Sequence, residues 1–176
     1  FQVGKEIGDS YMNRHQAVRC EVIPSEGSHQ NVARLQDGTA DVAIVQNDAV
    51  ADERVRSLAI LYTEVLHLVC RKDADVECLN DLTVHSTSLG SRSGGTYSLV
   101  EELLRFSRVE IPAEHQRNLG FSQSAEALRS GDLDAAFFLV GLGSEIIEDL
   151  IASPEFELVP IQLRAVGSEG TFVSER

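Results

Sequence analysis

Two stretches of the chain repeat one pattern of residues at the same spacing, and this repeat restricts the fold more than any other feature. Residues 27–43 read GSHQNVARLQDGTADVA, and residues 120–136 read GFSQSAEALRSGDLDAA. The identical positions lie at a constant offset: Gly27, Gln30, Leu35, Gly38, Asp41 and Ala43 match Gly120, Gln123, Leu128, Gly131, Asp134 and Ala136. Each copy predicts a helix that ends at a glycine, then an acidic residue that leads into a buried strand. Any helix–glycine–strand unit shares part of this pattern, but matching spacing throughout favours two similar lobes.

The rest of the chain alternates apolar runs with helical patterns. We expect apolar, strand-like runs at 18–23, 41–46, 58–61, 65–70, 82–84, 134–140 and 157–161. We expect helices at the start of the chain and near 29–37, 97–107, 122–130 and 144–152, with Ser28 as N-cap and Gly38 as C-cap of the second. This alternation predicts an α/β fold whose lobes are mostly parallel sheets flanked by helices.

The acidic balance of the chain excludes one class of partner. The net charge is −13 over 176 residues, whereas a nucleic-acid-binding domain needs a basic face. A small anionic ligand is still compatible, because local donors act at short range and the wider field is screened beyond about 8–10 Å. No apolar stretch approaches the ~18–20 residues of a membrane span, so we expect no direct membrane insertion of this segment.

Cysteines and histidines give no sign of a metal or redox centre. Cys20, Cys70 and Cys78 are an odd number without C-x-x-C spacing. A bridge between Cys70 and Cys78 is one alternative in an oxidising compartment, but we favour free thiols. The five histidines lack metal-ligand spacing, and no Ser-His-Asp or Cys-His grouping is evident. We therefore expect no enzyme activity, no metal and no cofactor.

Polar residues at the ends of two elements are candidates for ligand binding, because helix N-termini and strand carboxyl ends face the cleft in two-lobed α/β proteins. Ser28 and Asn31 lie at a helix start, where free N–H groups favour a carboxylate. Gln46 and Asp48 follow a buried strand. Gln46 can donate to a carboxylate, and Asp48 can either accept from an ammonium group or cap the next helix.

A glycine-rich loop before a helix is the second candidate. Its glycines allow close approach of an anion to the backbone, and its side chains add hydroxyl and guanidinium donors. The candidates in this loop are Arg92, Ser93, Gly94, Gly95 and Thr96. A nucleotide phosphate loop is disfavoured because no lysine follows the glycines. Tyr62 and Phe138 are placed to close over a ligand, although large side chains in strand-like runs also form cores.

Four of these segments, in the same order, resemble the TAXI branch of TRAP-transporter solute receptors. The similar runs are EVIPSEGSHQNVARLQDGTADVAIVQNDAV (21–50), LAILYTEVLHLVCRKDADVECLNDL (58–82), LGSRSGGT (89–96) and EALRSGDLDAAFFLVG (126–141). The family's first strand and its turn have no counterpart here. Since Val3, Ile7 and Tyr11 already follow helical spacing, we expect the sequence to begin inside a helix.

The resemblance implies a two-lobed, periplasmic-binding-protein-like (Venus flytrap) fold that closes on its ligand. It further implies a periplasmic or otherwise extracytoplasmic receptor for a small carboxylate, glutamate or a dicarboxylate, which it delivers to TRAP-type membrane permease subunits. We expect one lobe to span 1–71, with 161–176 returning to it, and the other to span 72–160. Two alternatives share this fold: a ligand-binding sensor domain of a membrane receptor and an effector domain of a transcription regulator.

Overall fold

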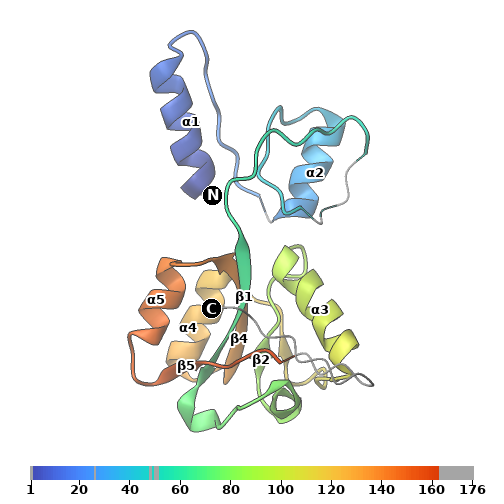
Figure 1. The fold of residues 1–176 in the computed structure, drawn as a ribbon, viewed down its shortest axis with the longest axis vertical. Coiled ribbons are helices and arrows are strands. Elements are labelled where there is room, and N and C mark those ends of the chain that lie inside the picture. Colours follow the sequence, from blue (N-terminus) through green and yellow to red (C-terminus); the bar gives the residue numbers. More distant parts are fainter. Residues whose placement is uncertain (1, 26, 48, 50–51, 163–176) are drawn as a thin grey trace.

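The computed structural model describes residues 2–25, 27–47, 49 and 52–162, and the chain divides into two unlike parts (Figure 1). Residues 64–162 contain every strand assigned in the described ranges, and these strands form a five-stranded sheet. Residues 2–63 contain the helices α1 (Gln2–Arg14) and α2 (Ser28–Asp37) and otherwise extended or turn segments. Strand β1 (Glu64–Arg71) leads from this first part into the sheet.

The sheet has the strand order β3-β2-β4-β1-β5. Its other strands are β2 (Thr87–Ser88), β3 (Gln116–Arg117), β4 (Ala135–Gly141) and β5 (Phe156–Leu158). Strand β2 pairs in parallel with β3 and β4, whereas β1 pairs antiparallel with β4 and β5. One reversed strand in an otherwise parallel sheet agrees with the predicted α/β class.

Helices cover both faces of this sheet. One core cluster joins Leu68 and Phe137 to α3 (Gly95–Ser107), and the other joins Val69 and Phe138 to α4 (Phe121–Ser130) and α5 (Glu145–Ile151). Neighbouring strand residues point to opposite faces, so the uninterrupted apolar run of β4 supplies both clusters. Each fully buried side chain of this size contributes about 1.5–3 kcal/mol.

The predicted apolar run at 82–84 is not a strand. Two 3₁₀ segments, Lys72–Ala74 and Leu79–Val84, follow β1 instead. The second is fixed at its start because the Asp81 carboxylate accepts the backbone N–H groups of Glu77 and Cys78. The strand of this region is the shorter β2.

The sequence repeat is also a repeat of local structure. Gly27 and Gly120 are the N-caps of α2 and α4, and Gly38 and Gly131 end them with φ of 77° and 82°. The prediction of Gly38 as C-cap is confirmed, whereas that of Ser28 as N-cap is wrong. Its hydroxyl accepts the backbone N–H of Gln46 and makes no cap bond.

The strands predicted at 18–23, 41–46 and 58–61 are absent. No backbone ladder joins these segments to other described residues, and the side chains of Val42, Leu58 and Ile60 are exposed. Strand β1 ends at Arg71, where the boundary between the lobes was expected, and it pairs with β4 and β5 of the later part of the chain. The boundary between the lobes stays a prediction. The expected return of 161–176 lies almost entirely outside the described residues.

All three cysteines are free thiols. Cys70 is fully buried in β1, and burial with the nearby charges of Glu157 and Asp134 raises its pKa to about 12. Within the described ranges, every helix is too short or too polar to cross a bilayer.

Candidate ligand-binding site

The loop before α2 touches the loop before α3, although the two belong to different parts of the chain. A Cβ atom added at Gly27 would lie 3.0 Å from the carbonyl oxygen of Ser93 and 3.2 Å from Cα of Gly94. Only a residue without a side chain permits this approach. The structure therefore brings together two loops that the sequence singled out separately.

Gln46 joins both parts at this place. Its backbone N–H donates to Ser28 Oγ at 3.0 Å, and its side-chain Nε2 donates to Glu64 Oε2 at 2.6 Å. Its Oε1 lies over Gly95, where an added Cβ would be only 1.4 Å away. The predicted residues Ser28, Gln46 and Gly95 are thus in one place, and Glu64 joins them.

The glycine-rich loop leads directly into α3. Gly94 is the N-cap, its N–H donates to the Ser91 carbonyl at 2.8 Å, and no side chain caps the helix. The N–H groups of the first turn have no partner within the helix, and the helix dipole makes this end positive. Thr96 is buried in this turn, and the hydroxyls of Ser91 and Ser93 are 3.2 Å apart. This end of α3 therefore favours a negatively charged or carbonyl oxygen.

Other predicted residues have partners of their own. Asn31 Nδ2 donates to the Ile44 carbonyl at 2.8 Å and so ties α2 to the segment that follows it. Arg92 Nε donates to Asn118 Oδ1 at 3.0 Å, and its guanidinium lies 5.9 Å from the centre of the Tyr97 ring. Both side chains thus serve local contacts in this conformation.

The two predicted aromatic residues differ in burial. Tyr62 is about half exposed, whereas Phe138 is completely buried in the sheet. The exposed ring at this place is that of Phe121, whose centre lies 6.1 Å from that of Phe138. Asp48 lies outside the described residues.

A hollow of about 300 Å³ opens next to the Gln46–Glu64 contact. Its described lining residues carry aromatic, carboxylate and hydroxyl groups and include the turn after β4: Tyr62, Glu64, Phe121, Val140, Gly141, Leu142, Gly143 and Ser144. Burial, then the charge of Glu64, raise the pKa of the Tyr62 phenol. Among these residues, only Tyr62 was predicted from the sequence to contact a ligand. Glu64 begins β1 and Phe121 begins α4. This position at the start of an element is the one sequence signal that could have marked them as site residues.

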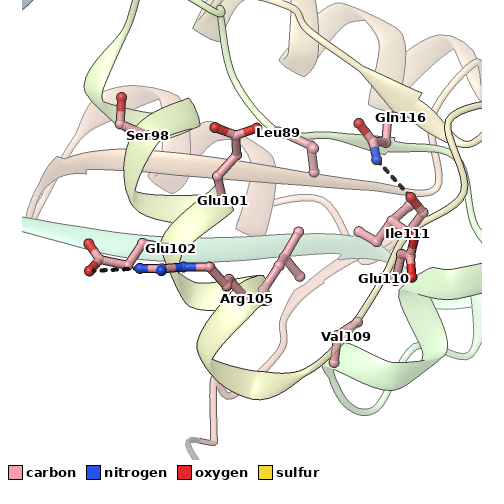
Figure 2. A pocket seen from close by; sticks show the side chains of 10 residues that line it. Leu89, Ser98, Glu101, Glu102, Arg105, Val109, Glu110, Ile111 and Gln116 are labelled. Carbon is pink, nitrogen blue, oxygen red and sulfur yellow. Dashed lines mark hydrogen bonds and ion pairs between the residues drawn. The ribbon is translucent and has the colours of Figure 1, made fainter.

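A larger hollow of about 690 Å³ lies along α3 and the segment that leads to β3 (Figure 2). Its labelled helix residues include Glu101, Glu102 and Arg105, and Gln116 Nε2 donates to the Ile111 carbonyl at 2.7 Å. Of the predicted site residues that the structure describes, none lines it. In the described part of the chain, no group of three His, Cys, Asp or Glu side chains is arranged to hold a metal ion.

Comparisons with known proteins agree with this architecture. The model of the NMT1-like family matches residues 1–169. Among solved structures, the substrate-binding protein of an amino acid ABC transporter is similar over 90% of this chain and 66% of its own length, with 17% identity and a TM-score of 0.62.

Two further structures have the same fold. One is an amino acid ABC transporter substrate-binding protein from Streptococcus pneumoniae, bound to L-arginine, with 17% identity over 93% of this chain and 65% of that one and a TM-score of 0.60. The other is the CcmR regulatory domain of Synechocystis PCC6803 in complex with 2-PG, with 13% identity over 89% and 74% and a TM-score of 0.60. The chain thus spans slightly less than two thirds of the two transporter proteins, and identities this low establish the fold alone.

Proposed function

The chain belongs to the NMT1-like family and has the fold of periplasmic solute-binding proteins, and from this we propose that it captures a small solute between residues 2–63 and residues 64–162. The two parts open and close around the solute, as hinged domains do. This function requires binding and release and no catalytic step.

The position of Gln46 is the observation that carries this proposal. It contacts Ser28 in the first part and Glu64 and Gly95 in the second. A solute-binding protein needs polar groups from both parts at one place, because differential contacts to the closed form drive closure. Ser28, Gln46, Gly94 and Gly95 meet this requirement.

The ligand carries a carboxylate in this proposal. The N-terminus of α3 supplies oriented N–H groups, Thr96 and Ser93 supply hydroxyls, and the adjacent glycines leave room for close approach. The Gln46 amide oxygen already lies against this turn, at the position that a carboxylate oxygen would take. Glutamate or a dicarboxylate fits this chemistry.

We further propose that the protein acts outside the cytoplasm and delivers the solute to membrane permease subunits of the TRAP type. The resemblance of four ordered segments to the TAXI branch supports the TRAP assignment, and the similar transporter proteins support a role in uptake. An effector domain of a transcription regulator is the second candidate, because the CcmR regulatory domain has the same fold. A helix-turn-helix domain in the same polypeptide would decide for the regulator.

Thermal unfolding with a panel of amino acids and dicarboxylates tests the proposal. A ligand that binds only the folded protein raises its stability by about 2.7 kcal/mol at a hundredfold excess over Kd. We expect Gly95→Val to abolish this stabilisation, since its side chain would occupy the place of Gln46. Ser98→Val is the matched control, because it lies in the same helix but lines the other hollow. A panel without any stabilising solute would refute solute capture.

A further inference from the structure

The hollow beside Gln46 holds a carboxylate that lacks a counter-charge. Glu64 is half-buried, and Gln46 Nε2 donates to it. Among the described residues, no lysine, arginine or histidine forms an ion pair with Glu64. A carboxylate that is partly removed from water and has no cationic neighbour is stabilised by any positive group that enters.

The rest of the lining favours the same kind of group. Tyr62 and Phe121 line the same hollow as Glu64, and aromatic faces attract ammonium and guanidinium groups. Val140 and Leu142 offer apolar surface to a hydrocarbon chain, and Ser144 adds a hydroxyl acceptor. The net charge of −13 raises the local concentration of positively charged solutes.

A metal ion does not fit this chemistry. Hard cations such as Ca²⁺ and Mg²⁺ take several oxygen ligands, usually with more than one carboxylate or with bound phosphate. Among the described residues, Glu64 is the one acidic side chain that lines this hollow. An organic cation, which needs a single carboxylate and an aromatic face, is the better match.

The Gln46 side chain indicates how such a ligand lies. Its carbonyl oxygen faces the N-terminus of α3 at Gly95, and its amide nitrogen donates to Glu64. The Gln46 side chain thus presents a hydrogen-bond acceptor to α3 and a donor to Glu64. A zwitterion has the same polarity, with a carboxylate at one end and an ammonium group at the other. Gln46 thus takes, within the protein, the arrangement that an amino acid would take between the same two groups.

We propose that the hollow formed by Tyr62, Glu64, Phe121 and Ser144 binds the ammonium group of the solute, which is therefore an amino acid rather than a plain dicarboxylate. This assignment rests on the proposed function, because the carboxylate of the same molecule lies at the N-terminus of α3. Glu64 supplies the counter-charge, and the two rings exclude water from the pair.

Matched ligand pairs test this assignment by calorimetry. Each pair consists of an amino acid and the acid that lacks only its α-amino group: L-glutamate and glutarate, L-leucine and 4-methylpentanoate, L-arginine and 5-guanidinopentanoate. We expect the preferred amino acid to bind at least about tenfold more tightly than its partner, since a hydrogen bond between two charged groups is stronger than one between neutral groups. Glu64→Gln should remove that preference, and Glu64→Asp should retain part of it.

Glu102→Gln is the control, because Glu102 is a largely exposed carboxylate on α3 that lines the other hollow. Thermal unfolding without ligand shows whether each variant is folded. Equal affinity for both members of the binding pair, or equal weakening of both by Glu64→Gln, would overturn the ammonium assignment and leave solute capture intact. Binding of no member of any pair would refute both proposals.

Discussion

The two copies of the helix–glycine–strand unit have the same local structure and very different surroundings. In each copy the two N–H groups after the terminal glycine donate to one helix carbonyl: Thr39 and Ala40 to Arg34, Asp132 and Leu133 to Ala127. After α4, the chain enters β4, which pairs with β1 and β2. After α2, the equivalent residues are extended, and no described strand lies beside them.

This difference separates structure that depends on nearby residues from structure that depends on residues far along the chain. A helix and its cap use hydrogen bonds within about ten residues, so the same residues form them in both copies. A strand is stabilised by its neighbours across the sheet, and isolated extended chain gains nothing comparable. The helix that packs on the sheet is also the more buried one. Helix α4 buries Ser124, Ala125 and Leu128, whereas α2 buries only Val32 among its residues.

The equivalent leucines of the two copies should show the largest effect of this difference. Leu128 is completely buried, whereas Leu35 is only partly buried. We expect Leu128→Ala to lower the free energy of unfolding by about 2–5 kcal/mol. Leu35→Ala should cost about 1 kcal/mol or less, because little cavity is created. Urea unfolding measures both, and equal losses would contradict the comparison.

Two cysteines extend the comparison to reactivity. Cys70 lies buried in β1, and burial raises its pKa to about 12, whereas Cys20 is partly exposed in the first part. The thiolate is the reactive form, so at pH 8 we expect iodoacetamide to modify Cys70 about a thousandfold more slowly than an ordinary exposed cysteine. Mass spectrometry of peptides follows each site, and Cys78, which is exposed, is the internal control.

The same shift has a consequence for stability. In the unfolded chain the Cys70 thiol ionises near its ordinary pKa of 9.0, whereas in the folded protein it stays protonated up to about 12. The unfolded state therefore loses a proton first, and the free energy of unfolding should fall as the pH rises above 9. Cys70→Ser would introduce a buried polar group, so Cys70→Ala is the better variant. A decline of the same slope in Cys70→Ala would show that another group causes it.

The elements that the sequence predicted well are those with local signals. The caps at Gly38 and Gly131 follow from glycine between a helical pattern and an apolar run. Strands β1 and β4 follow from mostly apolar runs, and both have partners. The run at 41–46 has the same composition but no partner among the described residues, and apolar pattern alone cannot report that.

The candidate site divides in the same way. Ser28 and Gly95 were predicted because they lie at the starts of helices, and Gln46 because it ends an apolar run, although that run is not a strand. Glu64 was missed because its role depends on Gln46, and their contact is a product of the tertiary arrangement. The sequence pointed to Phe138 as the ring that closes over a ligand, but the exposed ring is that of Phe121. A strand buried on both faces has no alternation of apolar and polar residues, so the pattern cannot show that Phe138 is buried.

The smallest predicted effect concerns the two terminal glycines, and it tests whether the local structure of the copies is equivalent. Gly38 and Gly131 both have left-handed φ, at 77° and 82°, so alanine at either position should cost about 1 kcal/mol in backbone strain. A Cβ at Gly131 would lie 3.5 Å from Arg71 Nη1, an ordinary contact, and at Gly38 it would meet nothing within 4 Å. Neither site therefore adds a steric cost.

The two backbone amides that follow each glycine donate to a carbonyl in the last turn of the helix. Hydrogen exchange of these amides therefore reports the cost of backbone strain directly. We expect each Gly→Ala variant to lower the protection of its own pair of amides by about fivefold, since 1 kcal/mol corresponds to that factor. The loss should be the same in both copies although the surrounding packing differs. A much larger loss at Gly131 would mean that packing against β1, rather than backbone conformation, sets the end of α4.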